Sequence, residues 1–192
     1  MFNQNGKKLF VLIAVLIVVG VVVFAVFGRG GAKVSLEAVS DKPSYVSGEE
    51  IKLAVRLTNT GDKNTCVSDT ALGNVKFLSV TRDGGPVETR TASSYFITSL
   101  AEMIKSKLKQ LAPGEKMEIA LSSSEDPELK AQALYTTALD KTSGLATFYG
   151  VQLPGTYQIE LVYEYPGEPS ADCSDVFEGI TNTATVSFTV TK

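Results

Sequence analysis

Ile51-Lys52-Leu53-Ala54-Val55-Arg56-Leu57-Thr58 is the stretch that decides the fold. Aliphatic side chains alternate with polar or small ones along its whole length, so the pattern repeats with a period of two. Successive side chains of a β-strand point to opposite faces of a sheet, whereas a helix would need a period of 3.6. We therefore predict a strand with one face on a core and the other in water.

The same alternation recurs along the chain. Strands are predicted around residues 34–38, 51–57, 74–81, 87–91, 117–121, 157–165 and 184–190. Asp83-Gly84-Gly85 separates two of these strands, and such residues suit the positive φ angles of a hairpin turn. About seven strands with one polar face each predict a mainly β fold, with two antiparallel sheets packed face to face.

Four segments carry a resemblance to known proteins: 42–49 (KPSYVSGE), 51–61, 111–115 (LAPGE) and 153–157 (LPGTY). With them the chain resembles the immunoglobulin-like domains of bacterial and archaeal envelope proteins, of the proteinase-inhibitor or macroglobulin-like type. The resemblance implies an immunoglobulin-like sandwich. It identifies a fold rather than an activity, because this sandwich hosts many unrelated functions.

Tyr157, two residues after Gly155, stands where such domains carry a tyrosine corner, whose hydroxyl bonds back to nearby backbone. A plain core tyrosine is the alternative. The two cysteines, Cys66 and Cys173, form the even count typical of an oxidising compartment, so we predict a disulfide rather than two free thiols. In the implied sandwich, their loops lie at the same end.

An uncharged apolar run covers residues 9–27, with Gly20 as its one interruption. Nineteen helical residues span about 28 Å, close to the hydrocarbon core of a bilayer. We predict a transmembrane signal-anchor helix, a cytoplasmic N-terminus at 1–8 carrying Lys7 and Lys8, and a short linker at 28–32. A cleaved signal peptide is the alternative, although the apolar run is long for one.

Residues 33–192 are then one extracytoplasmic domain, in the periplasm or on the cell surface, behind an anchor in the plasma (inner) membrane. Beyond the span the chain has 16 basic and 21 acidic residues, a net charge of −5. An acidic domain is a poor candidate for binding nucleic acid, so we expect none as a partner.

Two helices are predicted as insertions in the sandwich. Residues 94–111 have an apolar stripe at helical spacing. This helix packs on the sandwich or faces a partner, and in the second case Phe96, Leu100, Met103 and Lys107 form a candidate interaction helix. The second helix, near 127–142, would begin after Asp126 as N-cap with Pro127 at its first position.

Several chemistries are excluded. The chain has no histidine, which removes histidine-dependent triads and imidazole metal sites. Ser106 and Lys109 match the S-x-x-K spacing of serine acyl-enzymes, but the accompanying elements are missing. The acidic clusters near 125–128 and 172–178 lack the spacing of an EF-hand loop. We expect no enzyme, no cofactor and no metal.

The leading hypothesis is a single-pass envelope protein whose immunoglobulin-like domain binds or braces another envelope or membrane protein, or a second copy of this chain. It would be an accessory or structural component of a membrane-associated complex. The alternatives are a protease-inhibitor-like or other ligand-binding domain, and a subunit of a surface filament or envelope layer.

Overall fold

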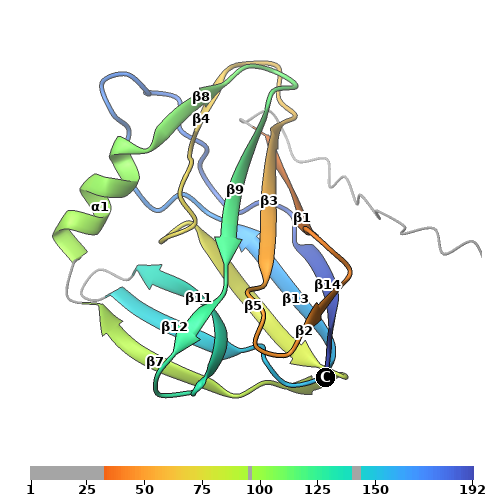
Figure 1. Cartoon of the computed structure of the whole chain (residues 1–192). Helices are drawn as coiled ribbons and strands as arrows, with labels where there is room; N and C mark the ends of the chain where they lie inside the picture. The colour runs from red at the N-terminus through yellow and green to blue at the C-terminus, as the bar shows by residue number, and fades with distance from the viewer. Residues whose placement is uncertain (1–32, 95–96, 140–143) are drawn as a thin grey trace, which may run out of the picture.

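A computed structural model describes residues 33–94, 97–139 and 144–192. This part of the chain is mainly β, as predicted, and its strands gather in several sheets (Figure 1). The elements are β1 (Val34–Ser40), β2 (Ser44–Val46), β3 (Lys52–Asn59), β4 (Thr65–Ser68), β5 (Val75–Arg82), β6 (Gly85–Pro86), β7 (Thr89–Ser94), α1 (Ile97–Ser106), β8 (Leu108–Leu111), β9 (Lys116–Ser122), β10 (Ser124–Asp126), β11 (Ala131–Leu139), β12 (Gly144–Gly150), β13 (Gly155–Tyr163) and β14 (Ala184–Thr191).

Two sheets enclose the main core. One has the strand order β1-β3-β9, and the other has the order β2-β14-β13-β5-β6. Neighbouring strands are antiparallel except β2, which runs parallel to β14. In Figure 1 the three-stranded sheet lies in front of β13 and β14. The arrangement is that of a β-sandwich.

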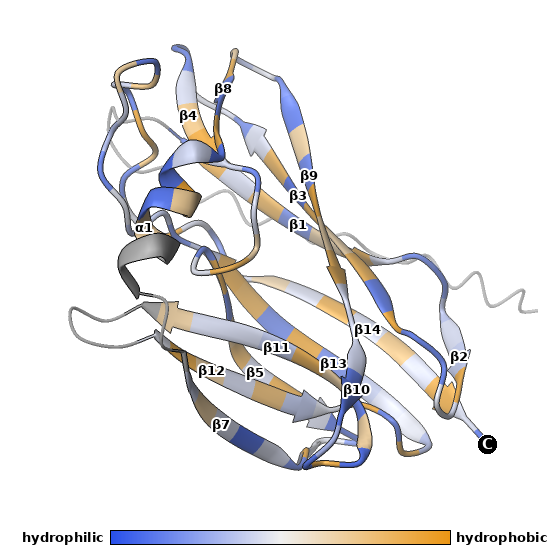
Figure 2. Ribbon diagram, turned by 60° about the vertical axis from the view of Figure 1, so that its left-hand side comes forward, coloured by the Kyte–Doolittle hydropathy of each residue, from blue (hydrophilic) through white to orange (hydrophobic). Residues whose placement is uncertain are grey.

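The predicted alternation is confirmed on β3. Leu53, Val55 and Leu57 are buried, whereas the residues between them are half-buried. Figure 2 shows polar and apolar residues alternating along β1 and β3. The buried row faces residues of β13 and β14 in one continuous cluster, which includes Ile159 and Phe188. Burial of this apolar row stabilises the pairing register, because a slip by one residue would move the whole row to the solvent face.

The turn at Asp83-Gly84 also forms as predicted. Both residues have positive φ, 51° and 79°, and Arg82 pairs with Gly85 across the turn. Two central residues with positive φ match the twist of the flanking strands. The second strand of this hairpin, β6, has only two residues, because the chain then leaves for another sheet.

That further sheet has the order β10-β11-β12-β7, and it corrects the prediction of a helix near 127–142. Asp126 does cap a turn, since its carboxylate accepts hydrogen bonds from the backbone N–H groups of Glu128 and Leu129. Lys130 then adopts a left-handed φ of 50°, which ends the turn. The chain continues as the nine-residue strand β11.

The helix predicted at 94–111 is correct in its middle and wrong at its end. α1 ends at Ser106, and residues 108–111 form β8, which pairs with β4. Pairing with β8 satisfies backbone groups of the fully buried strand β4, which a longer helix would leave unpaired. Residues 95 and 96 lie outside the described part.

No helix within the described ranges is long and apolar enough to cross a membrane. The span predicted at 9–27, the N-terminal segment 1–8 and the linker 28–32 lie outside those ranges.

Candidate interaction surface

The disulfide predicted between Cys66 and Cys173 is confirmed, with 5.9 Å between the two Cα atoms. Cys66 lies in β4 and Cys173 in the long connection between β13 and β14. Both residues are buried, with exposed fractions of 0% and 5%. The bond therefore fixes a connection that has little regular structure of its own.

Backbone hydrogen bonds reinforce the same attachment. The Cys66 N–H donates to the Asp175 carbonyl at 2.7 Å, and the Phe177 N–H donates to the Cys66 carbonyl at 2.8 Å. Phe177 is buried and its ring lies 6.3 Å from that of Tyr163, between centroids. The connection is thus held on β4 by covalent, polar and apolar contacts together.

Tyr163 joins this end to the core. Its hydroxyl oxygen accepts a hydrogen bond of 2.7 Å from the backbone N–H of Ser68, the last residue of β4. Burial raises the pKa of Tyr163 far above its ordinary value. The Ser68 hydroxyl in turn donates to the Ile104 carbonyl of α1 at 3.0 Å. One short chain of polar contacts therefore links β13, β4 and α1.

The structure describes two of the four side chains of the candidate interaction helix. Met103 is half-buried against the core, and Ile104 beside it is fully buried. Lys107 is exposed but lies after the end of α1, so it has no place on the apolar side of the helix. Phe96 and the side chain of Leu100 lie outside the described set. The described part of α1 packs on the sandwich through Ile104, and Glu102 and Ser106 on its other side are exposed.

A shallow pocket of about 260 Å³ lies between α1 and the disulfide-bonded connection. Its lining residues are Glu102, Lys105, Ser106, Leu108, Ser170, Asp172 and Cys173. The lining carries both signs of charge, from Glu102, Lys105 and Asp172, beside the apolar side chain of Leu108. The structure thus brings the predicted helix and one predicted cysteine together.

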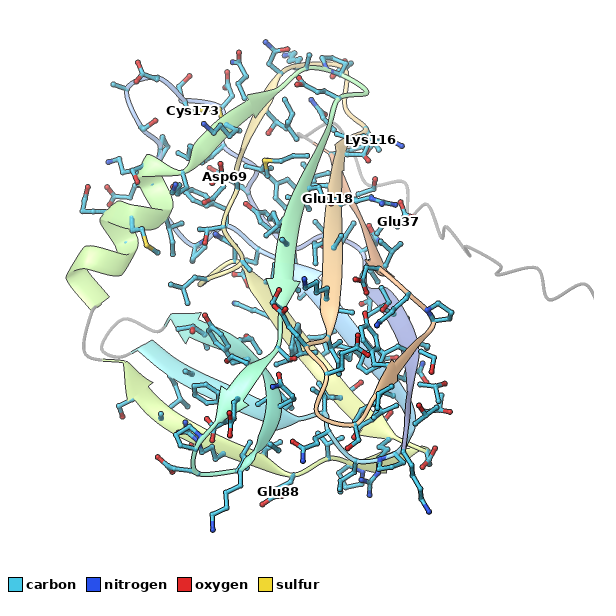
Figure 3. The ribbon with its side chains drawn as sticks, in the orientation of Figure 1. Glu37, Asp69, Glu88, Lys116, Glu118 and Cys173 are labelled. Atoms are coloured by element: carbon cyan, nitrogen blue, oxygen red, sulfur yellow. A yellow bond between two sulfur atoms is a disulfide. The ribbon has the colours of Figure 1, made fainter. Side chains whose placement is uncertain are left out.

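The described chain begins at this same end. The Lys33 carbonyl accepts a hydrogen bond of 2.8 Å from the Thr60 N–H, and Val34 pairs with Asn59. The Asn59 amide donates to the Leu111 carbonyl at the end of β8, at 2.9 Å. The first described residue, the β4–β8 strand pair and the disulfide therefore lie at the same end of the sandwich. We call the surface formed by α1, β8 and residues 164–183 the disulfide-end surface; Figure 3 shows Cys173 within it.

Tyr157 lies at the opposite end. Its hydroxyl donates to the Leu153 carbonyl at 2.8 Å, the bond expected of a tyrosine corner. The ring stacks on Phe188 with 5.3 Å between centroids, so it is a core aromatic as well. Burial raises its pKa. The structure does not bring Tyr157 near the other predicted site residues, and its contacts are those of a fold-stabilising side chain.

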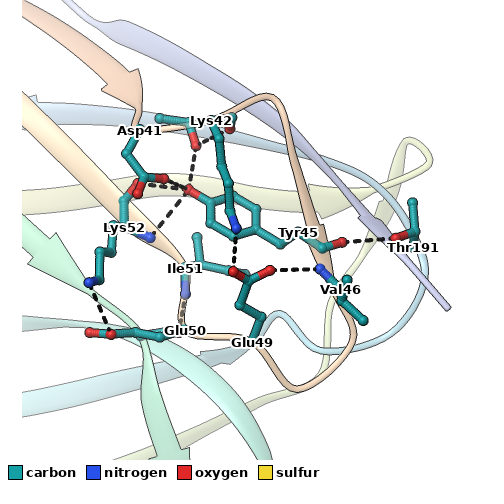
Figure 4. Close-up of polar contacts among 11 residues, drawn as sticks. Asp41, Lys42, Tyr45, Val46, Glu49, Glu50, Ile51, Lys52 and Thr191 are labelled. Atoms are coloured by element: carbon teal, nitrogen blue, oxygen red, sulfur yellow. Dashed lines mark hydrogen bonds and ion pairs between the residues drawn. The ribbon is translucent and has the colours of Figure 1, made fainter.

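A second tyrosine organises that opposite end. Tyr45 is 1% exposed, and its hydroxyl contacts Asp41, the Ser40 hydroxyl and the Lys52 carbonyl (Figure 4). Burial, followed by the hydrogen bond with Asp41, raises its pKa. Lys42 lies 4.8 Å above the ring and pairs with Glu49. The contacts of segment 42–49 therefore hold the Tyr45 hydroxyl in a buried position and stabilise the fold.

Sequence patterns missed one buried ion pair. The Nε–H of Arg90 in β7 is shared between the two carboxylate oxygens of Asp126, at 2.9 and 3.0 Å, and its Nη2 also donates to that carboxylate, which is 3% exposed. The Arg90 guanidinium also lies 4.2 Å from the ring centroid of Phe148. Hydrogen bonds from Arg90 are the main cause that lowers the pKa of Asp126 to about 2. Strand alternation could have indicated that Arg90 points to one face, but not which residue it meets.

The S-x-x-K match is divided between two elements. Ser106 ends α1, where its hydroxyl donates to the Met103 carbonyl at 2.8 Å, and Lys109 is an exposed residue of β8. Within the described residues no three Cys, Asp or Glu side chains group as metal ligands would.

No protein-family model and no curated protein matches this chain. A solved structure of AvmM, which catalyses macrocyclization in alchivemycin A biosynthesis, aligns with 84% of this chain and 90% of its own. The sequence identity is 13% and the TM-score is 0.33. At that TM-score the likeness supports no statement on fold or function.

Proposed function

We propose that this chain is a single-pass membrane protein of the cell envelope whose immunoglobulin-like domain binds another protein through the disulfide-end surface. The domain would serve as an accessory or structural component of a membrane-associated complex. The observation that carries the proposal is the position of Lys33, where the described chain begins, at the same end as α1, β8 and the disulfide.

The immunoglobulin-like assignment is supported by strand order. β1 is an outermost strand of the first sheet, where it pairs with β3. The chain then crosses to the second sheet, where the short strand β2 runs parallel to the last strand, β14. β13 then lies between β14 and β5, as the central strand of such a sandwich does. The Tyr157 hydrogen bond to Leu153 adds a second, independent likeness.

The short linker would hold the disulfide-end surface close to the membrane. Five residues, 28–32, separate the apolar run from Lys33, and they reach about 18 Å when fully extended. A domain held so closely would present its disulfide-end surface to the region just outside the bilayer. Its partner is then a membrane protein or another anchored envelope protein, with the N-terminus of this chain in the cytoplasm.

Co-purification of the full-length chain from its native membrane tests the proposal. We expect the chain to stay in the membrane during an alkaline carbonate wash. In mild detergent, we expect one defined protein to co-purify with it. The double variant Lys105→Glu with Asp172→Lys reverses two of the three charges that line the pocket, so we expect it to lose that partner. Ser187→Lys, at an exposed position in the middle of β14 and away from the disulfide-end surface, is the control and keeps the partner.

Release of the chain from the membrane by carbonate would contradict the proposed membrane anchor. Retention of the same partner by the charge-reversed variant would remove the disulfide-end surface from it.

A further inference from the structure

The outermost strands of the four sheets differ in how their free edges are covered. An open edge presents unpaired N–H and C=O groups to any extended chain, and natural proteins shield such edges with charges, proline, bulges or very short strands. In the described residues, β2 and β10 have three residues each and β6 has two, the second of them Pro86. These short strands offer little to pair with.

The longer outermost strands are shielded in other ways. β9 has the exposed charges Lys116 and Glu118, which Figure 3 shows along the strand. β8 has Lys109, and the four residues of β4 are all buried. On β1, the Asn182 side chain occupies the edge, where its amide accepts from the Leu36 N–H and donates to the Leu36 carbonyl.

β7 is different. It has six residues, from Thr89 to Ser94, with no proline and no register shift, and it pairs with β12 only. Figures 1 and 2 both show it at the outside of its sheet with no strand beyond it. Thr89, Thr91 and Ser93 share one face and are exposed.

The single charge of β7 is turned away from a potential neighbour. Arg90 lies on the other face, where Asp126 and Phe148 hold its guanidinium, and its side chain is only 19% exposed. The only charged side chain of β7 is thus paired with Asp126 and does not shield the edge of the strand. No other outermost strand of the described residues combines this length with uncharged, exposed hydroxyl side chains.

We propose that the β7 edge pairs antiparallel with β7 of a second copy of this chain, with Thr91 on the two-fold axis. This register places Thr91 opposite Thr91, Thr89 opposite Ser93 and Arg90 opposite Ala92. Cross-strand pairs of hydroxyl side chains are favourable, and no like charges oppose each other. A two-fold interface needs such a self-complementary strand.

The pairing joins two four-stranded sheets into one continuous sheet of eight strands. It goes beyond the proposed function, because it adds a second contact at a different place on the molecule. The contact itself uses no residue of the disulfide-end surface.

Thiol cross-linking of the full-length chain in its membrane tests the register. Opposed residues have Cβ atoms about 5 Å apart, within reach of a short bis-maleimide. We expect Thr91→Cys to give a product of twice the chain mass of 20.5 kDa. Thr89→Cys alone gives none, because its two copies lie about 13 Å apart in this register. A mixture of Thr89→Cys and Ser93→Cys restores the product.

Ser122→Cys, on the exposed side of β9, is the control for chance collisions. Thr91→Lys places two ammonium groups in opposition and should abolish pairing, which is measured as loss of the dimer in detergent. Coexpression of Thr91→Lys with Thr91→Glu restores it as a heterodimer, so a folding defect is distinguished from lost pairing.

A Thr91→Cys product no more abundant than that of Ser122→Cys overturns the proposal. A product that joins the Thr91→Cys variant to a different protein overturns the second copy as occupant. In either case a partner that still co-purifies through the disulfide-end surface leaves the proposed function standing, so the two failures are distinguishable.

Discussion

The two ends of the sandwich are held together by different means. At the end where the described chain begins, a disulfide and backbone bonds hold the 164–183 connection on β4. At the opposite end, the hydroxyls of Tyr45 and Tyr157 hold short segments next to the strands. A long connection loses more conformational entropy on folding than a short turn, so a covalent bond has more to contribute there. The covalent bond at the first end therefore holds an irregular connection in a fixed shape.

The largest effect is expected from the disulfide. In the double variant Cys66→Ala with Cys173→Ala, the unfolded chain loses a cross-link between residues 107 apart in sequence. The free energy of unfolding should fall by about 4 kcal/mol, measured by urea denaturation. The free energy of unfolding of the wild-type chain should fall by a similar amount when the denaturation is carried out with the disulfide reduced. A loss smaller than that of the tyrosine variants below would contradict the contrast between the two ends.

Tyr163→Phe comes next, because it removes the acceptor of a buried N–H at the disulfide end. The Ser68 N–H is then left without its 2.7 Å partner. We expect a loss of about 1 to 3 kcal/mol in the same denaturation experiment. Loss of partner binding without any loss of stability would contradict the structural role given to Tyr163.

The third effect is an acid sensitivity on the β7 side of the molecule. Because Arg90 lowers the pKa of Asp126 from 3.8 to about 2 in the folded state, the folded chain binds fewer protons than the unfolded chain between these values. The contribution of Asp126 to stability is therefore complete above about pH 4 and is lost as the pH falls towards 2.

Asp126→Asn should flatten that part of the profile of unfolding free energy against pH. Glu118→Gln is the matched control, because Glu118 forms an exposed ion pair with Arg56. A profile of Asp126→Asn that parallels the wild type between about pH 4 and 2 would contradict the assignment.

The smallest effect is expected from Tyr157→Phe at the opposite end. The change removes one hydrogen bond, to the Leu153 carbonyl, and leaves the stacking on Phe188 in place. The cost should be about 1 kcal/mol, measured as a shift in denaturation midpoint with unchanged slope. A cost above that of Tyr163→Phe would reverse the ranking of the two ends.

The sequence predicted the sandwich well where one face of a strand is buried. Alternation on β3, β9, β13 and β14 located these strands because their inward rows are aliphatic or aromatic. The β11–β12 hairpin was missed, since its apolar residues are not confined to alternate positions and include the exposed Tyr135 and Leu145, so it has no clean period. Asp126 and Pro127 gave a true turn signal, but Lys130 ends that turn after a few residues.

The candidate surface was predictable only in part. Cys66, Cys173 and the middle of α1 were recognised from residue type and local period. Asp172 and Ser170 line the same pocket as residues of α1 that lie more than 60 residues away in sequence, and no local pattern encodes such a neighbourhood. The same holds for Arg90 and Asp126, 36 residues apart in sequence.

Site-specific photo-cross-linking in the native membrane tests the central claim most directly. One full-length variant carries the photoreactive residue at Lys105, in the pocket of the disulfide-end surface, and another at Leu153, exposed at the opposite end. We predict an adduct with a membrane-associated protein from position 105 and none from position 153. An adduct from position 153 with none from position 105 would contradict the claim that the disulfide end is where this domain meets its partner.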